Sequence, residues 1–282
     1  MFSSLAPGKI LVDYGPISMV IEAYRNGQPL DRAAEAGGQA AVRQLQELTR
    51  YLYVAKRLAR QVEPREAYPA VLNMMIEATR ATGEPDVTPM AAVAGSIADA
   101  VLATLVEHGA TKAIVNNGGD IAIRVESSEP GPVRVGIITD LAAGVVTHSL
   151  DITQASQIGG IATSGLGGRS FTKGIASSVV ALAETAARAD ACATMLANAV
   201  NADHPAIART RAELIDPLTD IRGQLVTVEV GELDNETVSR AMQAGQRKFF
   251  QYQGRGLLLG VIMAVRGRVW MHPRDLAGRI VC

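Results

Sequence analysis

The sequence predicts a mixed α+β fold, and three observations lead to that class. Short apolar runs occur in pairs around turns that contain Gly or Pro, which is typical of β-hairpins. Longer segments repeat apolar residues at helical spacing and stop at Gly or Pro. No Pro-rich, Ser-rich or charged linker divides the 282 residues, so we expect one domain over 1–282 or two intimately packed subdomains.

The N-terminal part of the chain is expected to form a hairpin and three helices. Apolar runs at 9–12 and 17–23 flank a four-residue turn. Leucines recur among Arg, Gln and Glu from 31 to about 62, which predicts one long surface helix. A second helix is expected over 67–82. A third is expected from Thr88 to about His108, with a threonine as its N-cap and a proline in its first turn.

The first turns of this third helix carry unusually small side chains. Gly95 and Ser96 lie inside it, and a glycine within a helix costs roughly 1 kcal/mol relative to alanine. We therefore expect something to approach this face of the helix closely. Another backbone and a bound ligand are the two alternatives, and both stay open.

A polar break separates two predicted strands, 112–116 and 121–125. The residues at the break are Asn117, Gly118, Gly119 and Asp120. They offer amide and carboxylate groups at the end of a strand, so we treat Asn117, Gly118 and Gly119 as candidates for ligand binding and Asp120 as a candidate catalytic acid or base. Adjacent glycines allow a bulge or a tight bend. A plain hairpin turn would have much the same composition.

The stretch from 159 to 201 combines a flexible loop, a buried strand and a helix that carries an acid. The loop offers hydroxyls, a guanidinium and glycine N–H groups that can converge on an anion. Its candidate ligand-binding residues are Thr163, Ser164, Gly165, Gly167, Gly168, Arg169 and Ser170. A mobile surface loop without a ligand is the alternative.

The strand of this stretch is predicted at 177–184, and the helix begins near Ala186. Asp190 and Thr194 stand four residues apart, which places a carboxylate and a hydroxyl on one face of that helix. Hard oxygen donors in this arrangement suit Mg²⁺. The alternative is that Asp190 only favours the positive end of its own helix.

The remaining elements follow from the same patterns. They are strands at 133–139 and 149–153, a short helical region from Asp203, a strand at 224–230, a helix with Asn235 as N-cap that ends near 253, and a final hairpin over 257–271.

Composition narrows the class of partner. A formal net charge of -1 removes the electrostatic argument for nucleic acid or an anionic membrane surface, so a small molecule is the expected partner. The first residues lack the pattern of a secretory signal, and we find no uninterrupted apolar run of spanning length, so a cytoplasmic protein is expected. Cys192 and Cys282 form neither a metal spacing nor a disulfide framework. A homodimer is expected from the long helix and the helix face of small residues.

Several motifs together resemble the ApbE superfamily of flavin transferases. VNNGGDIAI at 115–123, TSG at 163–165 and ADACAT at 189–194 match it in order and spacing. PMAAVAG at 89–95 is similar to an uncharacterised ApbE-like branch, and the resemblance extends over about 88–201. It implies a bent mixed sheet with flanking helices and a cleft for a ligand such as FAD or FMN.

The resemblance also assigns residues. It implies that Asp190 and Thr194 match the superfamily's metal-binding Asp and Thr, and that the segment around Asn117 to Asp120 lines the cleft. The transferases carry a His-x-x-Asp-Pro-x-Thr-Gly segment where this chain has GLGGRSFTKGIASS, which places flavin transfer in doubt. Lys173 lies in that replaced segment and is a candidate catalytic residue, although a lysine beside a glycine loop is more often a solvated charge.

Three functional hypotheses follow. The first is a cytosolic ApbE-like enzyme that acts on a small anionic or heterocyclic metabolite with assistance from Mg²⁺. The glycine loop with Ser164 and Arg169 would hold the anion, and Asp120 or Asp190 would serve as catalytic acid or base or as metal ligand. The second is an Mg²⁺-dependent transferase that moves FMN from FAD to a protein threonine. The third is a flavin- or metabolite-binding protein without catalytic activity.

Overall fold

The structure is a computed structural model in which residues 1–279 are described, so Cys282 lies outside the described part of the chain. The chain divides into two compact units. Unit 1 comprises 1–134, 151–162 and 182–190, and unit 2 comprises 135–150, 163–181 and the residues from 191 onward. Both units combine helices with strands, and the mixed α+β class is confirmed.

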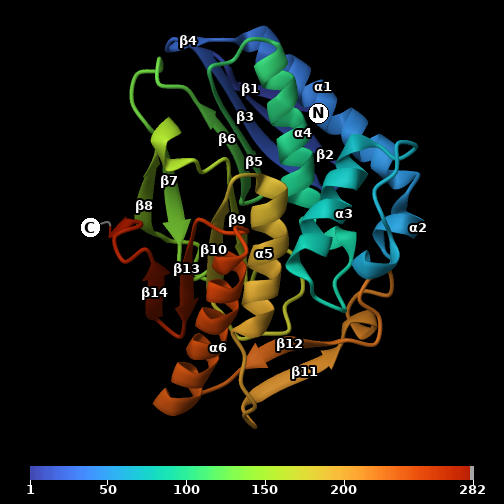
Figure 1. The fold of residues 1–282 in the computed structure, drawn as a ribbon, viewed down its shortest axis with the longest axis vertical. Coiled ribbons are helices and arrows are strands. Elements are labelled where there is room, and N and C mark those ends of the chain that lie inside the picture. The colour runs from blue at the N-terminus through green and yellow to red at the C-terminus, as the bar shows by residue number, and fades with distance from the viewer. Residues whose placement is uncertain (280–282) are drawn as a thin grey trace. The chain divides into compact units, whose positions relative to one another are not determined.

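The strands of unit 1 form an antiparallel sheet (Figure 1). In spatial order they are β1 (Phe2–Ala6), β2 (Lys9–Tyr14), β3 (Ile17–Arg25), β5 (Lys112–Asn117), β6 (Asp120–Val125) and β9 (Gly160–Ser164), with β4 (Gln28–Pro29) paired to β3. Buried and more exposed residues alternate along β3 and β5, because successive side chains of a strand point to opposite faces. One face of these strands therefore supplies the core.

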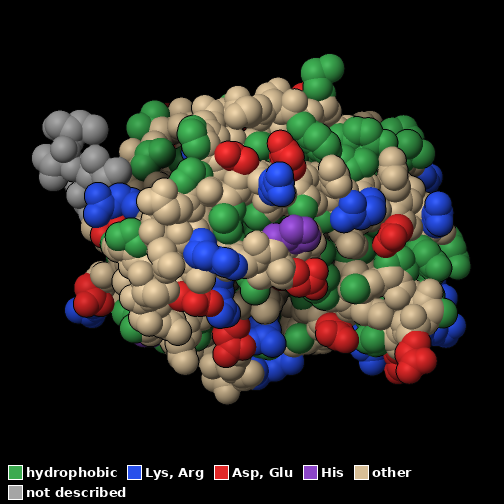
Figure 2. Space-filling view, turned by 90° about the horizontal axis from the view of Figure 1, so that it is seen from above, with side chains coloured by type: hydrophobic (Ala, Val, Ile, Leu, Met, Phe, Trp, Pro, Cys, Tyr) green, Lys and Arg blue, Asp and Glu red, His purple; other side chains and the backbone are tan. Residues whose placement is uncertain are grey.

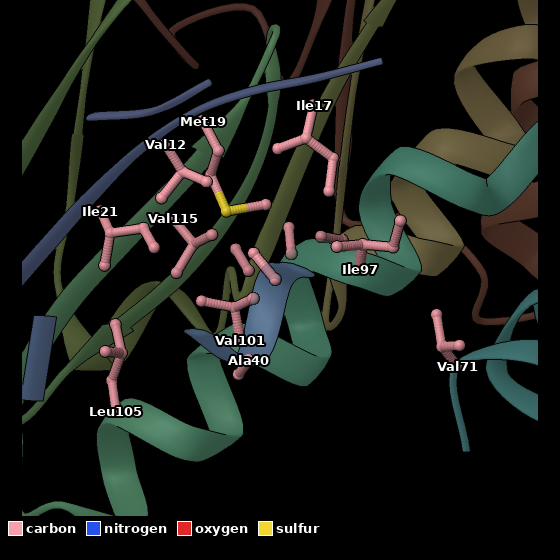
Figure 3. Packing of buried hydrophobic residues seen from close by; sticks show 14 of the residues in the cluster. Val12, Ile17, Met19, Ile21, Ala40, Val71, Ile97, Val101, Leu105 and Val115 are labelled. Atoms are coloured by element: carbon pink, nitrogen blue, oxygen red, sulfur yellow. The ribbon is translucent and has the colours of Figure 1, made fainter. Parts of the chain in front are cut away.

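Helices cover that core face. They are α1 (Asp31–Thr49), α2 (Leu52–Ala55), α3 (Ala70–Thr82) and α4 (Val93–Glu107), with short 3-10 turns at Ala59–Gln61 and Pro89–Ala92. Helix α4 packs against α1, α3, β5 and β6 (Figure 1). Figure 3 shows Val101 and Leu105 of α4 among Ile21 and Val115 of the sheet, and all four side chains are fully buried.

Two predicted helices differ from the observed ones. The continuous helix expected over 31–62 is wrong, because α1 ends at Thr49 and Tyr51 turns to make an edge contact with the ring of Tyr68, 5.6 Å between centroids. The third helix begins as the 3-10 turn at Pro89–Ala92. Thr88 precedes that turn as expected, but its side chain makes no capping hydrogen bond.

Most of the remaining elements belong to unit 2. They are β7 (Val133–Ile138), β8 (Val146–Ile152), a 3-10 turn at Gln154–Ser156, β10 (Ser178–Ala183), α5 (Ala186–Ala199), β11 (Ile207–Arg211), a 3-10 turn at Ala212–Leu214, β12 (Leu225–Val230), α6 (Asn235–Gly254), β13 (Gly260–Val265), β14 (Arg268–His272) and β15 (Gly278–Arg279). Helix α6 packs on β13, which pairs with β14. Segment 151–152 of β8, the turn at Gln154–Ser156 and residues 182–190 belong to unit 1.

Two expectations for unit 2 need correction. The residues after Asp203 form strand β11, paired with β12, instead of a short helical region. The N-cap of α6 is Asp234, whose Oδ1 accepts a hydrogen bond of 2.7 Å from the N–H of Thr237, so Asn235 is the first helical residue.

One apolar helical segment needs an explanation. Within the described residues, only Pro89–Glu107 has the length and the mean hydropathy, 1.7, of a membrane-crossing helix. Its buried side chains, among them Ile97, Val101 and Leu105, lie in the core of unit 1 (Figure 3). Core packing therefore accounts for its apolar composition.

On the face drawn in Figure 2, acidic and basic side chains are interspersed.

Candidate functional site

Within unit 1, a carboxylate of α4 and one of α5 each accept hydrogen bonds from the first turn of the other helix. The Asp99 side chain on α4 accepts hydrogen bonds from the N–H groups of Ala186 (3.0 Å) and Ala187 (2.8 Å), which begin α5. In return, Oδ2 of Asp190 on α5 accepts one from the N–H of Gly95 near the start of α4 (3.0 Å). The first N–H groups of a helix lack intrahelical partners, so each carboxylate caps the other helix. We call this arrangement the carboxylate exchange.

Gly95 is what allows the two helices to approach so closely. A Cβ atom at this position would lie 2.3 Å from the backbone oxygen of Ala186. No side chain fits in that space. The sequence left a backbone and a ligand as alternatives for this helix face, and the structure places the backbone of α5 there.

Burial and neighbouring acids raise the pKa of Asp190. The pKa of Asp190 is raised well above its ordinary value, first by burial of the carboxyl group and second by the negative charge of Asp120. The N–H groups of Gly95 and Ala94 act in the opposite direction. The Asp190 residue keeps some solvent exposure overall, but its carboxyl end points inward to these donors. Burial also raises the pKa of Asp99, to about 6.

The segment from Asn117 to Asp120 is a two-residue hairpin turn that joins β5 to β6. Gly118 and Gly119 occupy it with φ of 70° and 108°, a region that glycine adopts without strain, and Asn117 pairs with Asp120 across it. The buried Asn117 amide donates to the carbonyl of Ala94 (3.1 Å). This bond ties the turn to the start of α4. The plain hairpin is thus the observed alternative, and it holds Asp120 beside Asp190.

The glycine loop lies in unit 2 and makes much of its own turn. The N–H of Leu166 donates to the carbonyl of Ala176 (2.8 Å), and that of Gly168 donates to the carbonyl of Gly165 (3.2 Å). One of the N–H groups expected to bind an anion is therefore used within the loop. Thr163 and the buried Ser164 end strand β9 before the loop. The residues at its tip are exposed: Gly167, Gly168, Arg169 and Ser170.

Lys173 follows the loop and is fixed through its backbone. Its N–H donates to Oδ1 of Asn198 (2.8 Å), and its carbonyl accepts from Nδ2 of Asn201 (3.0 Å) and Oγ1 of Thr227 (3.1 Å). Thr194 stands one helical turn after Asp190 on α5 and is partly exposed.

The candidate residues thus fall into two sets. Unit 1 brings together Asp190 and the turn from Asn117 to Asp120, whereas the glycine loop, Lys173 and Thr194 belong to unit 2. Sequence reasoning missed Asp99 and the N–H groups of Ala94 and Gly95. A signal was present for Asp99, because it is a charged residue in the middle of a mostly apolar helix, whose other charged residue, Glu107, lies at the helix end.

The chemistry of the donors allows a test of whether Mg²⁺ suits the residues. Among residues 1–279, no cluster of three or more His, Cys, Asp or Glu side chains has the arrangement of a metal site. Asp120 and Asp190 nevertheless bring two carboxylates close enough to repel each other, and a cation relieves such repulsion. Mg²⁺ is commonly held by one or two carboxylates, with water and substrate as its other ligands. The residues present therefore fit this ion.

Comparison with known proteins identifies similar folds and the family of this chain. The fold is similar to that of the ApbE protein from Thermotoga maritima, with a TM-score of 0.52 at 12% identity over 96% of each chain. At this identity the likeness concerns the fold alone. The chain belongs to the family described as AbpE bacteria, whose model matches residues 3–271. The resemblance found in the motifs is confirmed.

Curated relatives are similar over part of the chain. The UPF0280 protein of Methanococcoides burtonii is 32% identical over 159 residues, 56% of this chain and 63% of its own length. That of Methanopyrus kandleri is 34% identical over 181 residues, 59% of this chain and 68% of its own length. The chain spans less than two thirds of the first three such relatives, at 63%, 60% and 60% of their lengths.

Proposed function

We propose that this chain is an ApbE-like enzyme that acts on a small anionic or heterocyclic metabolite at the carboxylate pair Asp120 and Asp190, with assistance from Mg²⁺. The observation that carries the proposal is the raised pKa of Asp190, which Asp120 and burial cause together. A buried carboxyl group whose pKa is raised by a second carboxylate beside it is typical of functional sites. Membership of the AbpE bacteria family supports a flavin-related role.

Each residue of the proposed site would have a separate role. Asp190 and Thr194 of α5 would hold Mg²⁺, as the family resemblance implies, and the ion would neutralise the negative charge of a phosphate- or carboxylate-bearing ligand. Asp120 would accept or donate a proton, because its carboxyl group lies beside that of Asp190. Gly95 would keep the Asp190 carboxylate in place through its N–H.

The flavin ligand is the first to test. In the ApbE superfamily, the resemblance implies cleavage of FAD and transfer of FMN to a threonine. This chain replaces one transferase segment by GLGGRSFTKGIASS, and the glycine loop in that stretch is closed by its own hydrogen bonds. We therefore rank transfer to protein below action on a free metabolite. A binding protein without turnover is the third alternative.

The experiment is a titration of the full chain with FAD, with and without Mg²⁺, that follows flavin fluorescence and AMP release. Asp190→Asn and Asp120→Asn are the test variants, and Asp13→Asn, an exposed acid on β2, is the matched control. Saturable flavin binding that both test variants weaken supports the carboxylate pair as the site. AMP release in addition would raise the transferase alternative to first place.

Binding without AMP release leads to a panel of anionic and heterocyclic metabolites, on which the proposal expects turnover that both test variants lose. Binding of all ligands without any turnover favours the binding protein. Equal behaviour of all four proteins toward every ligand contradicts the proposed site.

A further inference from the structure

A cavity of about 770 Å³ lies within unit 1, apart from the carboxylate pair. It is open to solvent on one side and lined by α3, the second half of α4, β6, segment 153–159 and the start of α5. Neither Asp120 nor Asp190 lines it. Small-molecule sites commonly have volumes of about 300–1,000 Å³, so this cavity is large enough for an organic ligand.

Much of the lining is apolar. Helix α4 contributes Leu102, Ala103 and Val106, and strand β6 contributes Ile123 and Val125. Val106 is 39% exposed, so part of its apolar surface is not covered by the core. A mostly apolar lining with a few polar groups is typical of pockets that bind the body of an organic molecule.

Some charged side chains around the cavity are held in ion pairs, and others can interact with a ligand. Arg124 is paired with Glu126 (2.8 Å), and Arg188 is paired with Glu184 (2.9 Å). Glu77 of α3 and Glu107 of α4 also line the cavity, and neither has an ion-pair partner among residues 1–279. The available charge is therefore negative.

Two further acids of the lining already have partners: Glu184 is paired with Arg188, and Asp99 accepts two hydrogen bonds. Asp99 directs both carboxylate oxygens to the N–H groups of Ala186 and Ala187. It fixes the wall formed by the start of α5 and adds negative charge to the lining. An anionic ligand would meet four acids here, of which one is paired with Arg188, whereas a cation would meet the carboxylates of Glu77 and Glu107 beside an apolar surface.

We propose that this cavity is a second ligand site, which binds a small organic cation with an apolar body, such as an amine whose ammonium group lies near Glu77 and Glu107 and whose hydrocarbon part covers Leu102, Ala103 and Val106. The site differs in residues and in ligand charge from the one proposed for the anionic metabolite.

The test is isothermal titration of the full chain with 4-phenylbutylamine and, separately, with 4-phenylbutyrate, which has a similar body and the opposite charge. The charge variant is Glu77→Gln with Glu107→Gln. Its matched control is Glu35→Gln with Glu47→Gln, two exposed glutamates of α1. The variant Ala103→Trp fills the cavity from an exposed position, where it leaves the core intact.

We expect saturable binding of the amine to one site, with binding of the carboxylate at least about tenfold weaker. The charge variant should weaken amine binding by about fivefold, in line with two partly exposed ion pairs, and Ala103→Trp should abolish it. The α1 control should bind like the unmodified chain. No saturable amine binding, equal binding of amine and carboxylate, or full binding by Ala103→Trp would each overturn the proposal.

Discussion

Asp99 and Asp190 each accept hydrogen bonds from the first turn of the helix that carries the other. The contacts run from Ala186 and Ala187 to Asp99 and from Gly95 to Asp190. The exchange fixes α4 against α5 and places Asp190 where Asp120 acts on its pKa. A structural contact thus prepares the carboxylate pair to which we assign the function.

Gly95→Ala tests the closeness of the two helices. The new Cβ would lie 2.3 Å from the Ala186 oxygen, so we expect the free energy of unfolding to fall by about 1–3 kcal/mol, the usual cost of overpacking. Gly254→Ala at the end of α6 is the control, because nothing lies within 4 Å of its Cβ. It should be neutral or stabilising by up to about 1 kcal/mol. Equal changes in urea unfolding would contradict the close approach.

Asp99 predicts a dependence of stability on pH. Its folded-state pKa is raised from 3.8 to about 6, so the folded chain holds this proton more tightly than the unfolded chain. The stabilisation is fully present below about pH 3.8 and is lost as pH rises through about 6, up to about 3 kcal/mol in all. Urea unfolding between pH 4 and 7 should show a shallower slope for Asp99→Asn than for the unmodified chain. An identical slope for the two proteins would show that Asp99 is not the source of the pH dependence.

Asn117→Ala tests the bond that ties the hairpin turn to α4. The substitution leaves the Ala94 carbonyl without the Asn117 donor, and we expect a loss of about 1–3 kcal/mol. Gln46→Ala removes a hydrogen bond of 3.1 Å that the side-chain amide of Gln46 donates to the hydroxyl of Tyr14 at an exposed position. Its effect should stay within about 0.5 kcal/mol, as is usual on surfaces. If thermal denaturation ranks the two variants in the opposite order, the turn does not depend on this bond.

The cap of α6 gives a prediction for unit 2. Asp234→Ala should cost about 1 kcal/mol, because it removes the acceptor for the Thr237 N–H. Asn235→Ala should cost less, since its side chain only accepts from Arg268 at an exposed position. Chemical denaturation of both variants distinguishes the observed cap from the one expected from the sequence. A larger loss for Asn235→Ala would restore the sequence-based assignment.

Local patterns were sufficient for elements that local residues determine. The β2–β3 hairpin, the strands around Gly118 and Gly119, and helix α5 appear close to their expected bounds. Alternating or periodic apolar residues carry enough information in such cases. The mixed fold class and the AbpE bacteria family followed from these patterns and from the order of the motifs.

Contacts between residues that are far apart in the sequence explain the predictions that were wrong or incomplete. Helix α1 stops early where Tyr51 meets Tyr68, and strand β11 forms because Ile207 pairs with Val230. Asp99 finds its donors 87 and 88 positions further along the chain. A single sequence does not reveal such pairs. The roles of the candidate site residues stay predictions for the same reason, since ligand contacts depend on groups that are far apart in the chain.

The most direct test of the carboxylate pair is calorimetric titration of the full chain with Mg²⁺. The account predicts one saturable site that Asp190→Asn and Asp120→Asn each weaken by about tenfold or more, because each removes one charge from the pair. Asp13→Asn should bind like the unmodified chain, and circular dichroism checks that all variants are folded. If folded Asp190→Asn and Asp120→Asn bind Mg²⁺ as well as the unmodified chain, or if the unmodified chain does not bind it, the central claim is wrong.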